Sequence, residues 1–186
     1  SNFTFFANDS LQGDGIQQVE RRWLYGYQTT MTKTMKLLGR DLSQESGLGI
    51  RLDDVGNIGL FRSQQRDLIS RVQHGSVNER NLFGWLSGKW SLSNHLDLTA
   101  ALRADVLQFG YTDRMEDNPG NARTANGIVS PKIALDYFVS DRFQLYAKTG
   151  SGYHSNDSRV VLGQYQVRIL PRALGADVGA MFKPAS

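Results

Sequence analysis

The residues best able to do chemistry near neutral pH are the three histidines, His74, His95 and His154. They are far apart in the sequence, and none stands in a metal-binding pattern such as H-E-x-x-H. Asp53 and Asp54 are adjacent, so on a strand their carboxylates would point to opposite faces and could not act on one ligand. No serine lies in a G-x-S-x-G turn. These patterns predict that the chain is not an enzyme and holds no metal or cofactor.

A polar run that follows an alternating strand is the best candidate for binding a ligand. It provides five candidate ligand-binding residues: Tyr153, His154, Asn156, Asp157 and Arg159. Polar loops of this kind carry the binding residues at the mouths of barrels. The alternative to ligand binding is a structural role, which is the more common role of these residue types in loops. In that role Asn156 and Asp157 would shape a turn, and Arg159 would pair with Asp157.

Charge and composition exclude several classes of protein. The chain has 186 residues and a formal net charge of +3, from 21 Lys and Arg against 18 Asp and Glu. It has no Lys/Arg run that could follow a nucleic-acid backbone, so we expect no nucleic-acid partner. It has no cysteine, which excludes disulfides. Mean hydropathy is −0.40, a value also compatible with strands that expose only alternate residues to lipid.

Strict alternation of apolar and polar residues dominates the sequence. It is clearest from Leu96 to Val106, where even-numbered positions are mostly aliphatic and odd-numbered positions are mostly polar. Two further alternating segments, 129–139 and 142–148, are joined by the polar turn at Ser140-Asp141. A period of two gives each strand one apolar and one polar face. This pattern predicts an all-β fold of antiparallel strands.

We expect about eight strands from this pattern and its turn residues. The expected strands are one that ends near residue 7, then 22–38, 44–54, 76–92, 96–106, 129–139, 142–152 and 172–182. Segments 8–21, 57–74, 113–126 and 153–171 are expected to be loops. Within the second of these, Leu60 to Val72 has some features of a helix, although it lacks a clear N-cap.

The expected connections alternate between short and long. Up-and-down membrane barrels have tight turns on one side and long loops on the other. The strands also reach the 9–11 residues that a tilted membrane-spanning strand requires. Aromatic residues would form two interfacial girdles, with Trp23, Tyr111 and Tyr153 at the long-loop ends and Trp90, Tyr137 and Phe143 near the short turns. The pattern alone leaves a soluble β-sandwich, used for binding or adhesion, as the alternative.

Specific motifs resemble those of TonB-dependent outer-membrane receptors. Ser130-Pro131-Lys132 resembles an "SPK" strand of the late barrel in that family, and a following strand ends in a similar polar run, Gly150-Ser151-Gly152-Tyr153-His154-Ser155-Asn156-Asp157-Ser158-Arg159. The opening segment 1–6 and the strand at 170–179 are also similar to barrel strands of the family. The resemblance therefore covers nearly the whole chain.

The resemblance implies a fold and a role for the parent protein. Residues 1–186 would form part of the wall of a large transmembrane β-barrel, without the plug domain, the TonB box and the remaining strands of a barrel of about 22 strands. The parent would lie in the outer membrane of a Gram-negative bacterium, in contact with its lipid. It would bind and take up a nutrient such as a siderophore or another metal chelate. The TonB protein would supply the energy through the plug region.

Overall fold

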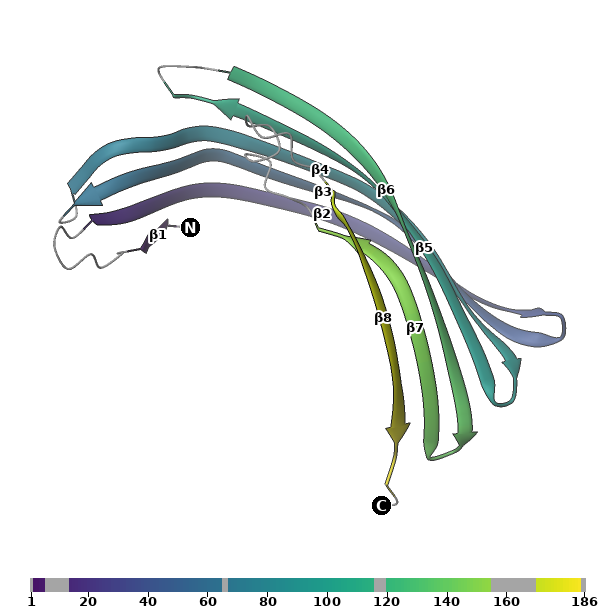
Figure 1. The fold of residues 1–186 in the computed structure, drawn as a ribbon. Helices are drawn as coiled ribbons and strands as arrows, with labels where there is room; N and C mark the ends of the chain where they lie inside the picture. The colour runs from purple at the N-terminus through teal and green to yellow at the C-terminus, as the bar shows by residue number, and fades with distance from the viewer. Residues whose placement is uncertain (1, 6–13, 65–66, 116–119, 155–169, 185–186) are drawn as a thin grey trace.

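The computed structural model describes residues 2–5, 14–64, 67–115, 120–154 and 170–184, with the backbone alone for 2–5 and 14. These residues form eight strands: β1 (Asn2–Phe5), β2 (Asp14–Leu37), β3 (Arg40–Gln64), β4 (Asp67–Ser93), β5 (Leu96–Asp113), β6 (Gly120–Ser140), β7 (Phe143–Tyr153) and β8 (Arg172–Phe182). Each strand pairs antiparallel with the next one in the chain, so the strand order is β1 to β8 (Figure 1). The prediction of about eight up-and-down strands is confirmed.

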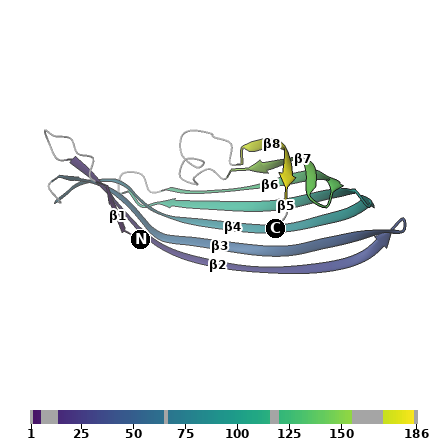
Figure 2. The same ribbon diagram turned by 90° about the horizontal axis from the view of Figure 1, so that it is seen from below.

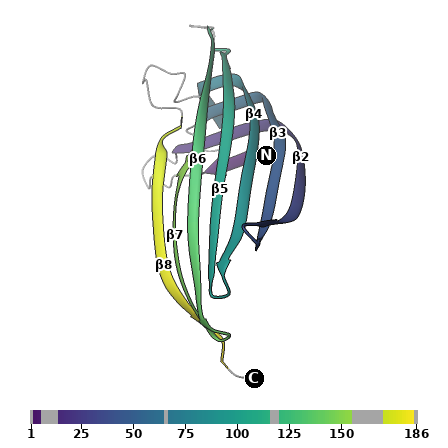
Figure 3. The same cartoon turned by 90° about the vertical axis from the view of Figure 1, so that its right-hand side faces the viewer.

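The eight strands form a single curved sheet that does not close on itself. Seen from below, β2 to β6 form the floor of a trough, and β7 and β8 rise along one side (Figure 2). Figure 3 shows the same strands running side by side along the length of the sheet. The described residues contain no second sheet packed against this one, so the β-sandwich alternative is wrong. No helix among them is long and apolar enough to cross a membrane.

Three expected loops are largely strand in the structure. The chain is extended from Asp14 through segment 14–21, throughout 57–64 and 67–74, and again from Gly120 onward. The candidate helix from Leu60 to Val72 is therefore wrong. Its irregular pattern has a physical cause, because the β3–β4 register shifts between Val55 and Ile58 and twice more beyond Leu60. Each such β-bulge moves the following side chains to the opposite face and interrupts the period of two.

The short turns lie where the sequence predicts them, with one adjustment. Ser93 and Ser140 each accept a hydrogen bond on Oγ from the backbone N–H two residues later, at 3.1 and 3.3 Å. The turn between β2 and β3 is Leu38-Gly39, with φ of 51° and 76°, and is shorter than the expected turn at residues 39–43, because β3 already begins at Arg40. Positive φ at both central residues is the geometry of a type I′ hairpin turn, whose twist matches that of the paired strands.

The outer, convex face carries the apolar residues of the alternating pattern. Leu102 and Val106 on β5 are 51% and 55% exposed, which shows that this row does not enter a core. Cross-strand pairing continues the row on both sides, through Leu82 on β4 and Leu135 on β6. The outer face also includes these exposed residues: Tyr25, Tyr27, Met31, Leu48, Ile50, Leu52, Leu86, Val129, Ile133, Tyr137, Leu145, Leu174 and Val178.

The inner, concave face holds the buried residues, which gather toward the end of the sheet away from the short turns. One cluster consists of Leu107, Phe109, Ile128 and Leu170, with Tyr153 packed against it. A second consists of Val55, Ile58 and Val77, with Tyr111 packed against it. The expected aromatic girdle is therefore wrong for Tyr111 and Tyr153, because both rings pack on the inner face.

Candidate functional site on the inner face

The inner face carries polar and aromatic side chains from several neighbouring strands. Partners directly opposite each other in an antiparallel pair share a face. Glu45 on β3 is opposite Ser87 on β4, so Trp85 and Phe83, two and four residues away, point inward. Arg103 on β5 is opposite Trp85 and therefore lies on the same face. The inward direction of the two rings explains why they break the apolar row of β4 in the sequence.

Asp105 is the most fully buried charged residue among those described, at 1% exposed. The guanidinium of Arg103 donates to both of its carboxylate oxygens at 2.8 Å, and Asn81 Nδ2 donates to Oδ1 at 3.2 Å. The Arg103 guanidinium carbon also lies 4.1 Å from the centroid of the Phe83 ring. A two-pronged ion pair stacked on an aromatic ring fixes the position of the arginine.

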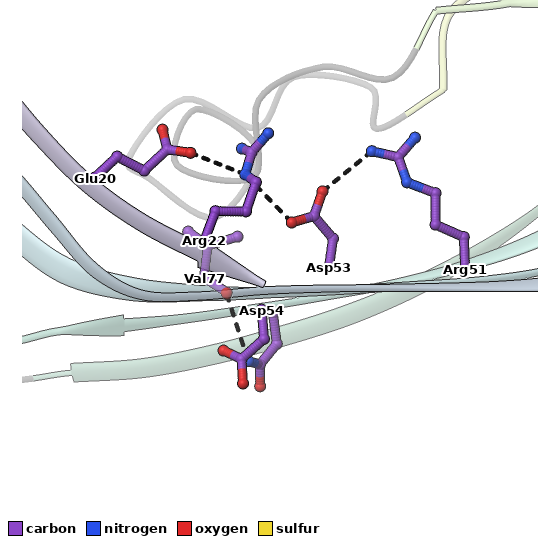
Figure 4. Close-up of polar contacts among 7 residues, drawn as sticks. Glu20, Arg22, Arg51, Asp53, Asp54 and Val77 are labelled. Carbon is purple, nitrogen blue, oxygen red and sulfur yellow. Dashed lines mark hydrogen bonds and ion pairs between the residues drawn. The ribbon is translucent and has the colours of Figure 1, made fainter. Parts of the chain in front are cut away.

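A second charged group surrounds Asp53 on β3. Its two carboxylate oxygens form ion pairs with Arg22 Nε at 3.3 Å and with Arg51 Nη2 at 3.1 Å. Arg22 Nε also lies 2.9 Å from Glu20 Oε1. Figure 4 shows these four side chains on one side of the sheet and Asp54 on the other. The expectation that Asp53 and Asp54 point to opposite faces is confirmed.

Glycines create the space in which the inward aromatic rings lie. A Cβ at Gly47 would be 2.3 Å from the Trp85 ring, and one at Gly49 would be 2.4 Å from the Phe83 ring. The Trp85 indole donates from Nε1 to Glu45 Oε1 at 3.0 Å. The rings therefore lie flat along β3 instead of projecting into the space above the sheet, which leaves that space open to other molecules.

Between β2 and β7 these side chains surround an open hollow of about 500 Å³. Its lining includes Gln28, Glu45, Trp85, Arg103, Ser130, Lys132 and Tyr153. Its surface has phenol, indole, carboxylate, guanidinium and ammonium groups, and therefore both hydrogen-bond donors and acceptors. Such a surface can hold a polar ligand by several weak contacts. The described residues contain no group of three or more His, Asp or Glu side chains that could hold a metal ion.

The structure describes two of the five candidate ligand-binding residues. Tyr153 is the last residue of β7 and lines the hollow. His154 is exposed, and its backbone N–H donates to the carbonyl oxygen of Pro171 at 3.2 Å. Asn156, Asp157 and Arg159 lie outside the described residues. The candidate residues omitted Trp85, Glu45 and Gln28, because alternation within one strand gives no information about which strands meet across the sheet.

The other polar side chains of the inner face pair with one another along the sheet. Lys148 pairs with Asp177 on β8 at 3.1 Å, and Gln144 donates to Asp136 at 2.6 Å. Asp105 pairs within its own strand. All these contacts join side chains on the same or adjacent strands, as required in a wall one layer thick.

The sheet, its two faces and its tight turns agree with a family comparison. The sequence profile described as "TonB dependent receptor-like, beta-barrel" matches residues 1–180. The chain belongs to this receptor β-barrel family. The resemblance stated from the motifs at Ser130 and Gly150 is therefore confirmed.

Two solved structures show the same fold as this barrel segment. The ferric citrate transporter FecA in its unliganded form matches with a TM-score of 0.78 at 12% identity, over 91% of this chain and 26% of that one. The ferric yersiniabactin uptake receptor FyuA from Yersinia pestis matches with a TM-score of 0.64 at 12% identity, over 92% and 28%. No curated protein sequence matches the chain. The chain spans about a quarter of the length of the two solved proteins.

Proposed function

We propose that residues 1–186 form part of the barrel wall of an outer-membrane receptor that binds and takes up a ferric chelate or a similar scarce nutrient. The observation that carries the proposal is the division of one sheet into an apolar outer face and a polar inner face, in a chain that belongs to the TonB-dependent receptor β-barrel family. The two solved relatives are named for ferric citrate and ferric yersiniabactin. These names support a ferric chelate as the cargo.

The outer apolar row has the dimensions of a membrane-facing belt. It extends over the eleven positions from Leu96 to Val106 on β5 and continues on β3 through Leu48 and Ile50. Eleven residues of a tilted strand rise about 25–30 Å, close to the height of the lipid-facing band of outer-membrane barrels. Beyond the belt, Asp54 and Arg80 replace the aliphatic residues on the outer face. Outer-membrane lipid is therefore the proposed partner of the convex face.

The hollow on the inner face and the chain that follows it are the proposed contact region for the cargo. Tyr153 lines the hollow, and His154, Asn156, Asp157 and Arg159 follow it directly in the sequence. All five stay candidate ligand-binding residues. In this proposal their function is reversible binding, and the chain contributes neither a catalytic residue nor a cofactor.

The remaining parts of the transport cycle are assigned to the parent protein outside residues 1–186. We propose that the parent supplies a plug domain inside the barrel, a TonB box and the strands that close the wall. The TonB protein would act on the plug and not on this sheet. The whole of residues 1–186 is then one structural unit, a partial barrel domain.

The topology can be tested with cysteine labelling in intact cells, because the segment has no native cysteine. Asn156→Cys and Ser140→Cys would be introduced separately into the full-length parent and exposed to a membrane-impermeant maleimide. We expect labelling at position 156 only, because Ser140 lies at the short turn before β7, whereas position 156 follows Tyr153, the residue at the other end of that strand. Labelling at both positions would instead indicate a module displayed on the cell surface.

The cargo is tested separately by uptake of radioactive iron. A strain lacking the parent gene, and the same strain complemented with it, would be supplied in turn with ferric citrate, ferric yersiniabactin and free ferric iron. Uptake of a chelate that requires both the gene and TonB would support the proposal. Equal uptake of every iron source in both strains would exclude ferric chelates of these kinds as the cargo.

A further inference from the structure

A small hollow flanked by two arginines lies on the outer face immediately beyond the apolar belt. Arg80 projects from β4 and Arg123 from β6, on either side of Gly110 on β5. Asn78 and Gln108 complete the polar lining of this hollow, whose volume is about 50 Å³. It is separate from the inner-face site, because the sheet lies between the two.

The strand register fixes these side chains to the outer face. Arg80 is directly opposite Gln108, and Asn78 is opposite Gly110, which is opposite Arg123. Two residues closer to the short turns, Leu82 is opposite Val106, and both are exposed on the outer face. No register shift intervenes in the pairing of β4 with β5 or of β5 with β6 over these residues. Arg80 therefore lies one pairing step beyond the Leu82–Val106 rung, and Arg123, opposite Gly110, lies two steps beyond it.

The space between the arginines depends on Gly110. A Cβ at that position would lie 3.7 Å from Arg123 Cγ and 3.8 Å from Asn78 Cβ, so a longer side chain would fill the hollow. Because position 110 has no side chain, the guanidinium groups of two non-adjacent strands can reach the same small ligand. Asn78 Nδ2 donates to Asp54 Oδ1 at 2.8 Å, and Asp54 is not part of the lining of the hollow.

The two arginine charges are not neutralised within the part of the chain that the structure describes. Neither Arg80 nor Arg123 forms an ion pair there, whereas Arg22, Arg51 and Arg103 on the inner face all do. Arg71, farther from the belt, stacks 5.9 Å from the centroid of the Phe61 ring. Guanidinium groups suit phosphate oxygens because each presents paired donors in one plane. The pair is thus suited to an anion with several oxygens.

We propose that Arg80 and Arg123 bind the phosphate group of a membrane lipid. The position of the hollow selects a lipid over a soluble anion, because the acyl chains of a lipid bound there would lie along the Leu82–Val106 rung. Basic residues at the edge of a hydrophobic belt attract anionic lipid head groups in this way. The lipid would be in the leaflet on the side opposite the short turns. This inference rests on the proposed membrane location of the sheet, but not on the proposed cargo.

The test measures lipid binding to the full-length parent receptor, purified in a non-ionic detergent. Native mass spectrometry would compare phosphatidic acid with phosphatidylcholine of the same acyl chains, and inorganic phosphate would be titrated in a separate arm. The variants are R80Q and R123Q, with R71Q as the control at an arginine of β4 farther from the belt. We expect phosphatidic acid to bind more tightly than phosphatidylcholine, and each of the two variants to weaken it about fivefold. R71Q should have no effect.

Three results would overturn the proposal. Equal binding of the two lipids would show that the phosphate is not recognised, and an equal loss with R71Q would show only a general effect of surface charge. Inorganic phosphate binding as tightly as the lipid, and lost in the same variants, would identify a site for a soluble anion. Iron uptake by the same variants separates this proposal from the proposed function. A receptor that takes up no ferric chelate, but binds phosphatidic acid through Arg80, would refute the proposed cargo and leave the lipid site standing.

Discussion

At the scale of single residues, Asp105 shows how a charged group is accommodated in a wall one layer thick. Its carboxylate is buried, and it accepts hydrogen bonds from Arg103 and Asn81 on the inner face. Arg103 is 41% exposed, so one end of the pair remains in contact with water. The arrangement holds the guanidinium beside the hollow without burying a second full charge.

Removal of the Asp105 carboxylate is expected to destabilise the barrel more than removal of an exposed partner. Asp105→Ala should lower the free energy of unfolding by about 1–3 kcal/mol, because Arg103 and Asn81 lose their acceptor. Asp97→Ala is the control, since Asp97 pairs at 2.9 Å with Lys89, which is 53% exposed. That change should cost less than about 1 kcal/mol. Urea unfolding of the full-length receptor, followed by tryptophan fluorescence, checks both values, and equal losses would contradict the prediction.

Leu38 occupies a backbone conformation that suits asparagine better than leucine. Its φ is 51°, and its side chain is 83% exposed at the β2–β3 turn. Leu38→Asn should stabilise the receptor by about 1 kcal/mol, because Asn-Gly is a preferred pair in type I′ turns and asparagine tolerates positive φ. Leu37→Asn, inside β2, should give no gain. Thermal unfolding of the two variants tests this, and a lower Tm for Leu38→Asn would count against the turn geometry.

At the scale of elements, each long strand has two parts with different surroundings. On β5 the part near the short turns is apolar on the outer face, and the part beyond Val106 has Gln108, Gly110 and Thr112 on that face and packs Leu107 and Phe109 on the inner face. Register shifts in the β3–β4 pair lie in the second part. The change of pattern within a single strand therefore marks the edge of the proposed membrane belt.

The two faces of β5 are expected to differ sharply in their tolerance of a charge. Leu102→Lys places an ammonium on the outer face near the middle of the belt, and should cost about 2–4 kcal/mol in lipid. Ala101→Lys, on the adjacent residue, points into the inner hollows and should cost much less. Refolding yield and unfolding free energy in lipid vesicles provide the comparison. A similar cost at both positions would mean that the outer face does not meet lipid.

At the scale of the whole molecule, the sheet is an open arc with apolar side chains over its convex face. β1 and β8 are at its two edges, and each pairs with only one neighbour among the described residues. Unpaired strand edges and large apolar surfaces both promote association between chains. The segment is therefore suited to a larger, closed wall and not to independent existence in water.

Expressed alone, residues 1–186 are expected to aggregate in plain buffer. The exposed backbone of the edges and the uncovered outer face should drive association, and a mild detergent should reduce it by covering the apolar belt. Analytical ultracentrifugation with and without detergent tests this. A monodisperse, folded monomer at high concentration in plain buffer would contradict the prediction and the assignment of the convex face to lipid.

Much of this architecture was predictable from local sequence. Alternation identifies the two faces of β5, and turn residues locate Ser93-Asn94 and Ser140-Asp141, because each depends only on neighbouring residues in the chain. The absence of a catalytic pattern likewise required only residue types and spacing. The family resemblance was carried by two motifs, at Ser130 and Gly150, which lie on paired strands.

The tertiary structure alone decided where the strands end and which side chains meet. Segments 57–64 and 67–74 were mistaken for a loop or helix, because bulges shift side chains between faces and hide the period of two. The groups around Asp53 and between Arg80 and Arg123 join residues from different strands, and such contacts depend on register. Register is fixed by pairing across the whole sheet, so the local pattern determines the faces of each strand and the assembled sheet determines the sites.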